Sequence, residues 1–470
     1  MTADAETGSA AASQPGPVPQ LSFLEPAAAV DLPAAAVEPP TAPEPIRAPE
    51  PATAPEPAEP ARVLRELPLG PPREVIADRE GFLAAVDLIA AGHGPIAIDA
   101  ERASGYRYSQ RAYLIQVFRR GAGVFLFDPP PIGDFLPLQA AIGEEEWVLH
   151  AATQDLTCLR ELGLDPVRLF DTELGARLAG LDRVGLGPVV ETLLGIHLAK
   201  EHSAADWSTR PLPQTWLEYA AKDVELLIDV RDAMHELLTE QDKLDVAAQE
   251  FEDVLHRDLV PVRVEPWRRL NSLHTVRGGR GLAVARELWL ERDAYAREID
   301  TAPGRLVPDA SLVAVARILP ADKRAMSALR EFSGRASRSQ IDRWWAAVER
   351  GMATTDLPSS RAPSDGSTLP PPRAWADRNP EADLRLKAAR AAITLVSEAR
   401  RIPLENLLTP DALRRVAWTP PAEITTESIA EALQSHGARR WQTDACAQII
   451  AASFVEVAQV PEEAPETTSP

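Results

Sequence analysis

The sequence "PIAIDAERASGYRYSQRAYLIQVF", residues 95–118, contains the features that decide the fold. Residues 96–98 form a short apolar run that predicts a buried strand. Asp99 and Glu101 follow, and because side chains alternate along a strand, both carboxylates lie on one face. Two neighbouring carboxylates repel one another, and a divalent cation would remove that repulsion. The pair is therefore either a metal site or a solvated strand end.

The overall charge is acidic, with 49 Lys and Arg residues against 70 Asp and Glu residues and a formal net charge of -21. This balance argues against a protein that holds nucleic acid through its overall charge. Cys158 and Cys446 are too few for a disulfide framework or a cysteine zinc site, and they suit a cytoplasmic location. No apolar run reaches the ~20 residues that span a bilayer, so we expect no membrane partner.

Proline and charge mark the ends of the predicted domains. Residues 1–62 are rich in Ala, Pro and Glu, with fourteen prolines among the first 60, which predicts a disordered tail. Regular apolar patterns begin near residue 73. Residues 353–380 form a linker rich in Pro and Ser, and residues 456–470 form an acidic tail.

Residues 73–240 show a mixed pattern of strands and helices. We expect strands over 95–100, 112–118, 123–128 and 146–150, and helices over 80–91, 153–162, 172–180, 186–194 and 213–240. From residue 243 onward the apolar spacing is helical. The predicted fold class is therefore α/β, a mixed sheet covered by helices with an antiparallel edge, followed by two all-α helical bundles over 278–352 and 381–455. A helical linker is expected over 241–277.

Two further acids stand at suggestive places. Asp155 follows a short apolar strand and opens a predicted helix, for which Thr153 is a plausible N-cap. Asp223 lies four residues after Tyr219 on a helix that begins near Pro213, so the two share one helix face. Each acid alone has a structural explanation, because helix N-termini favour acids and the exposed faces of helices often carry them.

Together, these acids resemble the DEDD exonuclease superfamily: an Asp-x-Glu at a strand end, an Asp opening a helix, and Tyr-x-x-x-Asp in a long helix. The tyrosine places the chain in the tyrosine branch, since the histidine branch would have His at Glu218. The segments "LFDTELGARLAG" (169–180) and "LAKEHSAADWSTRPLPQTWLEYAAKDVELL" (198–227) resemble the ribonuclease D family. The helical bundles resemble its HRDC-type domains, the second one divergently. Ala100 and the long acidic N-terminal tail depart from the family pattern.

The resemblance implies a ribonuclease H-like mixed sheet and a two-metal 3′-5′ exoribonuclease that releases nucleoside 5′-monophosphates. Asp99 would bridge two Mg²⁺ or Mn²⁺ ions, Glu101 and Asp223 would hold the ion that activates water, and Asp155 would support the second ion. Tyr219 would complete the catalytic set by orienting the nucleophile, because its unperturbed pKa of ~10 makes it a poor general base.

Further residues are candidates for substrate binding. Arg102 follows the metal pair and could meet a phosphate, whereas Gln116 and His150 stand near strand ends and could contact the terminal nucleotide. Structural roles are at least as plausible for each. Segment 261–280 interleaves arginines with Trp267, which suits a single-strand path but also a linker that packs on the nuclease. The arginines proposed for this path are Arg268, Arg269, Arg277 and Arg280.

The expected partner is the single-stranded 3′ end of RNA, with transfer-RNA precursors among the candidates, and the expected role is maturation of stable RNA or RNA turnover by a monomer. Two alternatives stay open. One is a 3′-5′ exonuclease that acts on DNA. The other is a nucleic-acid binding protein without catalysis, against which the intact acids and Tyr219 argue.

Overall fold

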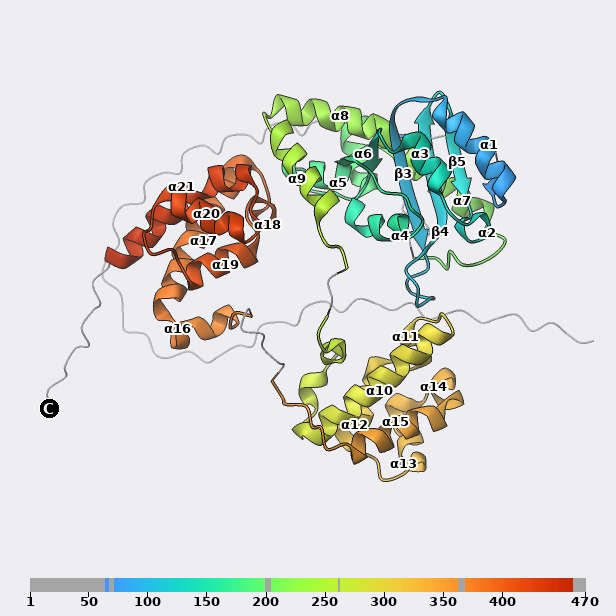
Figure 1. Cartoon of the computed structure of the whole chain (residues 1–470), viewed down its shortest axis with the longest axis vertical. Coiled ribbons are helices and arrows are strands. Elements are labelled where there is room, and N and C mark those ends of the chain that lie inside the picture. The colour runs from blue at the N-terminus through green and yellow to red at the C-terminus, as the bar shows by residue number, and fades with distance from the viewer. Residues whose placement is uncertain (1–63, 67–71, 199–203, 261–262, 362–367, 460–470) are drawn as a thin grey trace, which may run out of the picture. The chain divides into compact units, whose positions relative to one another are not determined.

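A computed structural model describes residues 64–66, 72–198, 204–260, 263–361 and 368–459 (Figure 1). The predicted N-terminal tail at 1–62 and most of the acidic tail at 456–470 lie outside these residues. The described residues group as one unit. All structural statements below concern the described residues of that unit.

A six-stranded mixed sheet organises the first part of the chain, in the order β2-β5-β4-β3-β6-β7. Its strands are β2 (Val75–Ile76), β3 (His93–Arg102), β4 (Ala112–Arg120), β5 (Gly123–Phe127), β6 (Glu146–Leu149) and β7 (Arg168–Asp171). β4 runs antiparallel to both β3 and β5, whereas β6 is parallel to β3 and to β7. A second, two-stranded sheet joins β1 (Arg65–Glu66) to β8 (Ile196–His197). The predicted mixed sheet is confirmed, and β2 and β7 are additional strands of it.

Helices cover this sheet. They are α1 (Arg79–Ala90), α2 (Pro129–Ile132), α3 (Leu136–Ile142), α4 (Leu156–Arg160), α5 (Thr172–Ala179), α6 (Leu186–Leu194), α7 (Gln214–Glu225), α8 (Leu227–Glu240) and α9 (Leu244–His256). The helix predicted over 213–240 is thus two helices that meet at Leu226. The segment predicted as a helix over 153–162 is a 3-10 turn, η1 (Ala152–Gln154), followed by the short α4.

The alternation of β3 separates two hydrophobic cores. Ile96, Ile98 and Ala100 belong to the core that contains Phe82 of α1. Ala97 belongs to the other core, together with apolar residues of α5, α7 and α8. Since Asp99 and Glu101 alternate with Ile98 and Ala100, the two carboxylates project on the side that α7 and α8 cover.

The first helical bundle follows α9. It comprises α10 (Gly278–Glu298), α11 (Pro303–Leu306), α12 (Asp309–Ile318), α13 (Lys323–Ser327), η4 (Arg330–Phe332), α14 (Arg335–Ser339) and α15 (Ile341–Ala353). Two 3-10 turns, η2 (Pro266–Arg269) and η3 (Leu273–Thr275), precede it and bury Trp267 and Leu273 in its core. The linker predicted over 241–277 is therefore divided: Phe251 of α9 packs in the nuclease core, and residues 266–276 pack in the first bundle.

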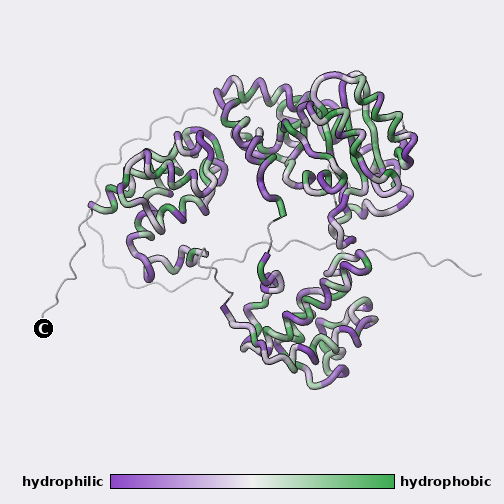
Figure 2. Tube along the Cα trace, in the orientation of Figure 1, coloured by the Kyte–Doolittle hydropathy of each residue, from purple (hydrophilic) through white to green (hydrophobic). Residues whose placement is uncertain are grey.

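The second helical bundle comprises η5 (Pro372–Ala374), α16 (Trp375–Arg378), α17 (Pro380–Arg400), α18 (Leu404–Leu407), α19 (Pro410–Trp418), α20 (Thr426–Ser435) and α21 (Arg440–Gln459). Figure 2 shows hydrophobic and hydrophilic residues interleaved along the helices of both bundles, as amphipathic helices require. None of the described helices combines the length and the apolar character that a membrane crossing requires.

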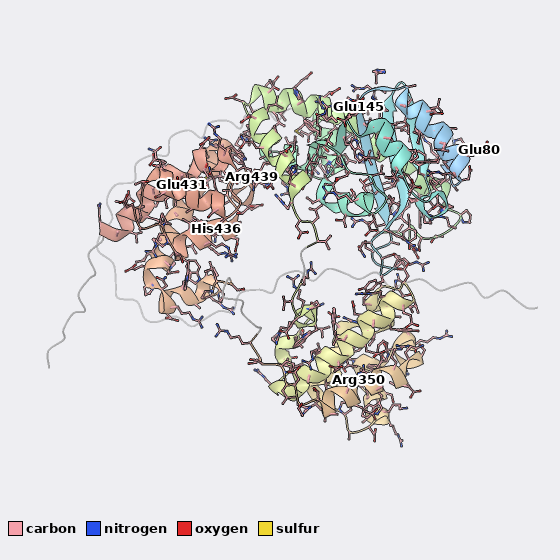
Figure 3. All side chains as sticks on the ribbon, viewed as in Figure 1. Glu80, Glu145, Arg350, Glu431, His436 and Arg439 are labelled. Atoms are coloured by element: carbon pink, nitrogen blue, oxygen red, sulfur yellow. The ribbon has the colours of Figure 1, made fainter. Side chains whose placement is uncertain are left out.

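A buried ion pair joins α9 to the second bundle. Glu250 accepts hydrogen bonds from Nε and Nη2 of Arg439, both at 2.7 Å, and from Nε1 of Trp441 at 2.7 Å. Arg439 directly precedes α21 and is labelled in Figure 3. Because Glu250 is almost fully buried, its carboxylate depends on these donors for compensation.

Candidate active site

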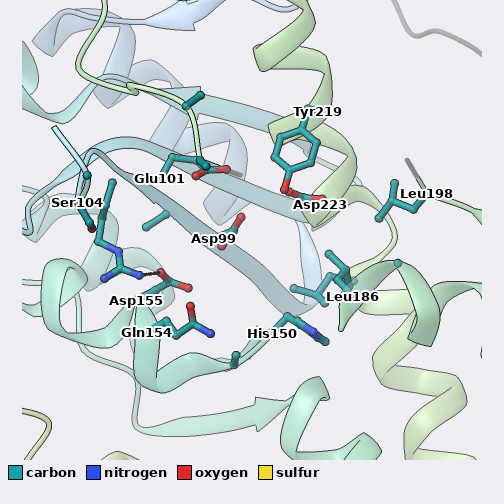
Figure 4. A pocket seen from close by; sticks show the side chains of 18 of the residues that line it. Asp99, Glu101, Ser104, His150, Gln154, Asp155, Leu186, Leu198, Tyr219 and Asp223 are labelled. Atoms are coloured by element: carbon teal, nitrogen blue, oxygen red, sulfur yellow. Dashed lines mark ion pairs between the residues drawn. The ribbon is translucent and has the colours of Figure 1, made fainter. Parts of the chain in front are cut away.

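Three carboxylates meet where β3 passes beneath α7. Asp99 and Glu101 come from β3 and Asp223 from α7, and one oxygen of each lies within 4.8 Å of the others. Figure 4 shows the three side chains pointing toward one another. Asp223 is buried, whereas Asp99 and Glu101 are partly exposed toward the pocket.

Asp155 approaches the same site from the neighbouring strand. β6 pairs with β3 in parallel, and the chain then turns through η1 to reach Asp155. Asp155 itself occupies the N-cap position of α4, and Thr153 lies inside η1, so the prediction that Thr153 caps this helix was wrong. The Asp155 carboxylate pairs with Arg102 at 3.7 Å (Figure 4).

The acidic cluster is electrostatically unfavourable when no cation is bound. Burial raises the pKa of Asp99, and burial together with the charge of Asp99 raises the pKa values of Asp155 and Asp223 well above their usual range. Burial and the neighbouring carboxylates raise the pKa of Glu101 to about 10. An all-oxygen donor set that needs positive charge fits a hard divalent cation.

Tyr219 lies beside this cluster, one helical turn before Asp223. Its hydroxyl group hydrogen-bonds the carboxylate of Asp223. Burial and the nearby carboxylates raise the pKa of Tyr219 above its already high value. The phenol therefore stays protonated, so it can orient a neighbouring oxygen but cannot act as a general base at neutral pH.

These residues line a pocket of about 520 Å³. Its wall also includes residues that the sequence did not single out, namely Ser104, Gly105, Tyr106, Gln154, Leu186, Leu198, Ala204 and Ala205. Gln154 directly precedes Asp155, and that position could have indicated from the sequence that it lines the pocket. The other residues lie on loops and helix ends that only the folded chain brings together.

The comparisons with known proteins agree with this geometry. Residues 74–239 match the family described as "3'-5' exonuclease", and residues 281–348 match the HRDC domain. Residues 368–454 match the family described as "3' to 5' exonuclease C-terminal domain". Ribonuclease D of Acidiphilium cryptum is 30% identical over 325 residues, which are 66% of this chain and 80% of that protein.

The chain belongs to the ribonuclease D family. Ribonuclease D of Gluconacetobacter diazotrophicus is 33% identical over 245 residues, 51% of this chain, and the match spans only 61% of that relative's length. Membership of this family, with its exonuclease domain, places the chain among the 3′-5′ exoribonucleases. The acidic cluster and the HRDC domain further imply a divalent metal and a nucleic-acid partner.

Two solved structures are similar to the chain. A protein from Bifidobacterium adolescentis has a TM-score of 0.75 and 36% identity, and the match covers 83% of this chain and all of that one. Escherichia coli RNase D, described as an exoribonuclease involved in structured RNA processing, has a TM-score of 0.58 and 26% identity. That match covers 78% of this chain and 99% of that one.

Among the predicted substrate-binding residues of this ribonuclease D family member, Arg102 and His150 line the pocket. Burial lowers the pKa of His150 to about 4, so its ring is neutral, and its Nδ1 lies 2.8 Å from Oγ1 of Thr172. Gln116 is not among the described residues that line the pocket. It lies opposite Asp99 in the β3–β4 ladder and is fully buried, because β4 is an inner strand under α7. Contact between Gln116 and the terminal nucleotide therefore stays a prediction.

The four predicted arginines of the RNA path fall into two pairs. Arg268 donates to the carboxylate of Glu265 at 2.6 Å, and its guanidinium carbon lies 4.3 Å from the centre of the Trp267 ring. Arg268 also donates to the carbonyl of Ser359 at 3.0 Å, and Arg280 donates to the carbonyl oxygens of Gly351 and Thr354, so each arginine ties distant parts of the segment 266–359 together. The other two arginines, Arg269 and Arg277, are exposed.

The loop between β3 and β4 connects the pocket to the first bundle. The backbone N–H of Ala302 donates to the carbonyl of Tyr106 at 2.9 Å, and Arg305 donates to the carbonyl of Gly105 at 2.7 Å. The Arg305 guanidinium also lies 3.8 Å from the centre of the Tyr106 ring. The first bundle thus fixes a loop that lines the active-site pocket.

The family-like segment around Trp207 has a structural role. Arg210 forms two hydrogen bonds with the carboxylate of Asp128, at 2.6 and 2.7 Å, and donates to the carbonyl of Tyr113. Trp207 is fully buried beside α7. These contacts fasten the segment that leads into α7, and they thereby help to place Tyr219 and Asp223.

Proposed function

We propose that this chain hydrolyses RNA stepwise from the 3′ end with the help of two divalent metal ions, and that it releases nucleoside 5′-monophosphates. The observation that carries the proposal is the cluster of Asp99, Glu101 and Asp223, whose oxygens lie within 4.8 Å of one another beside Tyr219. Its place in a 3′-5′ exonuclease domain supports the same reaction.

The four acids would divide the ions between them. Asp99, Glu101 and Asp223 would hold one ion, and Asp99 and Asp155 would hold the other. Bound ions lower the pKa of an attacking water and stabilise the charge on the leaving oxygen. Magnesium and manganese both suit carboxylate oxygens, and we propose that either supports the reaction.

The remaining residues of the pocket position the substrate. Tyr219 stays protonated, so its O–H can orient the attacking water as it now orients the Asp223 carboxylate. Arg102 offers a fixed positive charge on the pocket wall, where a phosphate of the substrate could approach it. His150 is neutral and would contact the terminal nucleotide by hydrogen bonding without adding charge.

The pocket suits the end of a single strand. Its volume of about 520 Å³ is typical of sites that take a small ligand, and so it would admit terminal nucleotides. Arg269 and Arg277 would contact phosphates further along the strand. We propose RNA 3′ ends, transfer-RNA precursors among them, as substrates of a monomer. The two buried free cysteines, Cys158 and Cys446, support a reducing, cytoplasmic location.

Matched RNA and DNA oligonucleotides of one sequence, labelled at the 5′ end, test the proposal. With Mg²⁺ or Mn²⁺ we expect a ladder that shortens from the 3′ end, faster on RNA, together with free nucleoside 5′-monophosphates. Chelation should stop the reaction. Glu101→Gln should be inactive, and the exposed Glu80→Gln serves as its control (Figure 3). Internal cuts, or hydrolysis that survives chelation, would contradict the proposal, and faster digestion of DNA would make DNA the substrate.

A further inference from the structure

The carboxylate of Asp171, at the end of β7, accepts four backbone hydrogen bonds. Its Oδ1 accepts from the N–H groups of Glu173 at 3.0 Å, Leu174 at 3.1 Å and Ala151 at 3.0 Å. Its Oδ2 accepts from the N–H of Ala152 at 2.9 Å. The side chain is fully buried, so these donors are what compensates its charge.

Two of the four donors belong to the turn that carries Asp155. In that turn the N–H of Gln154 donates to the carbonyl of Ala151 at 2.9 Å, and the N–H of Asp155 donates to the carbonyl of Ala152 at 3.1 Å. Ala151 has φ of 61°, in the left-handed region, which costs an L-residue with a side chain about 1–2 kcal/mol. The sequence of the turn therefore does not favour this conformation by itself, and hydrogen bonds to a residue outside the turn must stabilise it.

Capping of α5 does not explain all four bonds. Asp171 is the N-cap of α5, and that role accounts for the donors Glu173 and Leu174. Ala151 and Ala152 lie 20 and 19 residues earlier in the chain. They come within reach because β6 and β7 are paired, with Leu149 opposite Asp171. One carboxylate thus joins the start of α5 to the turn before Asp155.

We propose that Asp171 is a positioning residue for the active site: by holding the amides of Ala151 and Ala152, it sets where the Asp155 carboxylate stands. It touches neither substrate nor metal and acts through the backbone of the turn. The inference rests on the proposed function, since it concerns the ion that Asp155 would hold. Mutation of a residue that supports a metal ligand typically lowers metal affinity or activity by about 10- to 100-fold.

Two substitutions separate this role from capping. Asp171→Ser keeps an N-cap oxygen of comparable quality for α5, but its single oxygen on a shorter side chain cannot also reach Ala151 and Ala152. Asp171→Asn keeps the size of the side chain and one acceptor, and it turns an NH₂ group toward backbone donors. Asp78→Ser is the matched control, because Asp78 caps α1 by accepting from Gly81 at 2.8 Å, away from the pocket.

Direct Mn²⁺ binding without RNA is the first measurement. We expect the dissociation constant of the ion that Asp155 would hold to rise by about 10- to 100-fold in Asp171→Ser and Asp171→Asn, and to stay parental in Asp78→Ser. In steady-state assays the Mn²⁺ concentration for half-maximal kcat should rise equally, with kcat recovering at high Mn²⁺. A cap with no further role would lower the Tm and leave both metal constants unchanged.

Amide hydrogen exchange of the metal-free protein is the second measurement. In the parent, the amides of Ala151 and Ala152 should exchange as slowly as those of β6, and in the Asp171 variants they should exchange at least tenfold faster. Rapid exchange of these two amides in the parent would overturn the proposal even if no variant folds. Unchanged Mn²⁺ binding by a folded Asp171→Asn would do the same. Absence of RNA hydrolysis by the parent would instead refute the proposed function, because neither the direct Mn²⁺ binding measurement nor amide exchange uses RNA.

Discussion

The hydroxyl group of Tyr219 hydrogen-bonds the carboxylate of Asp223, one turn further along α7. A helix places residues four apart on one face, so this contact follows directly from the spacing in the sequence. It also keeps the phenol protonated and aimed at the carboxylate cluster. The tyrosine is therefore a hydrogen-bond donor at the site and not a proton acceptor.

Tyr219→Phe should lower kcat by about 10²- to 10³-fold, the usual effect of removing one donor that acts on the reacting groups. Mn²⁺ binding should change little, because all four carboxylates remain. Tyr108→Phe is the control, since the Tyr108 hydroxyl also bonds an acid, Asp293, at 3.0 Å. Equal kcat values for Tyr219→Phe and the parent would remove Tyr219 from the catalytic set.

His150 should make the fold sensitive to acid. Burial lowers its pKa to about 4 despite the opposing charge of Glu173, whereas an unfolded histidine titrates near ~6.5. The unfolded state therefore binds the proton first, so stability is present above pH ~6.5 and is lost as the pH falls toward 4. Between pH 7 and pH 5 the loss from this group should be about 2 kcal/mol.

The variant His150→Gln tests this effect. Its free energy of unfolding in urea should fall less than that of the parent between pH 7 and pH 5. The exposed His436→Gln (Figure 3) should behave as the parent does. The same pH dependence in all three proteins would show that His150 titrates normally in the fold.

The ion pair between Arg439 and Glu250 should stabilise the joint between α9 and the second bundle. Arg439→Ala leaves a buried carboxylate without its cation, which typically costs about 3–5 kcal/mol. The neighbouring Arg440→Ala is the control, because that side chain is 84% exposed and lies 3.8 Å from Asp444. Exposed pairs of this kind contribute about 0–1 kcal/mol. Similar urea midpoints for the two variants would contradict the assignment.

The exposed arginines before and at the start of α10 should contribute to RNA binding. Replacing Arg269 and Arg277 by Gln should weaken the binding of long RNA and reduce the slope of log K against log salt by about 0.7 per contact. Replacing Arg268 and Arg280 by Gln should instead lower the Tm, because both arginines bond within the first bundle. An unchanged salt slope after the first pair of substitutions would exclude those two arginines from the RNA path.

Local periodicity made much of the site predictable. The period of two in β3 and the four-residue spacing in α7 place Asp99, Glu101, Tyr219 and Asp223 on faces that meet in the fold. β7 was not predicted, and its pairing with β6 is what makes it a strand. The same pairing brings Asp171 to the turn before Asp155, a contact between residues far apart in the sequence.

The sequence could not show how the fold engages the candidate substrate-binding side chains. Gln116 has the sequence context of a strand end, yet β4 continues to Arg120 inside the sheet, which buries the side chain. Arg268 and Arg280 contribute charge to a basic segment, but backbone carbonyls and Glu265 already use their donors. Counting charges along a segment cannot show which guanidinium groups the fold has already engaged.

The metal site is tested most directly by comparing the parent with Asp99→Asn in the release of nucleoside 5′-monophosphates from an RNA oligonucleotide at a fixed Mg²⁺ concentration. We expect steady release by the parent that stops on chelation. We expect no measurable release by Asp99→Asn, with a Tm equal to or above that of the parent, because one of the mutually repelling carboxylates has been neutralised. Release by Asp99→Asn at the parental rate would contradict the assignment of the metal site.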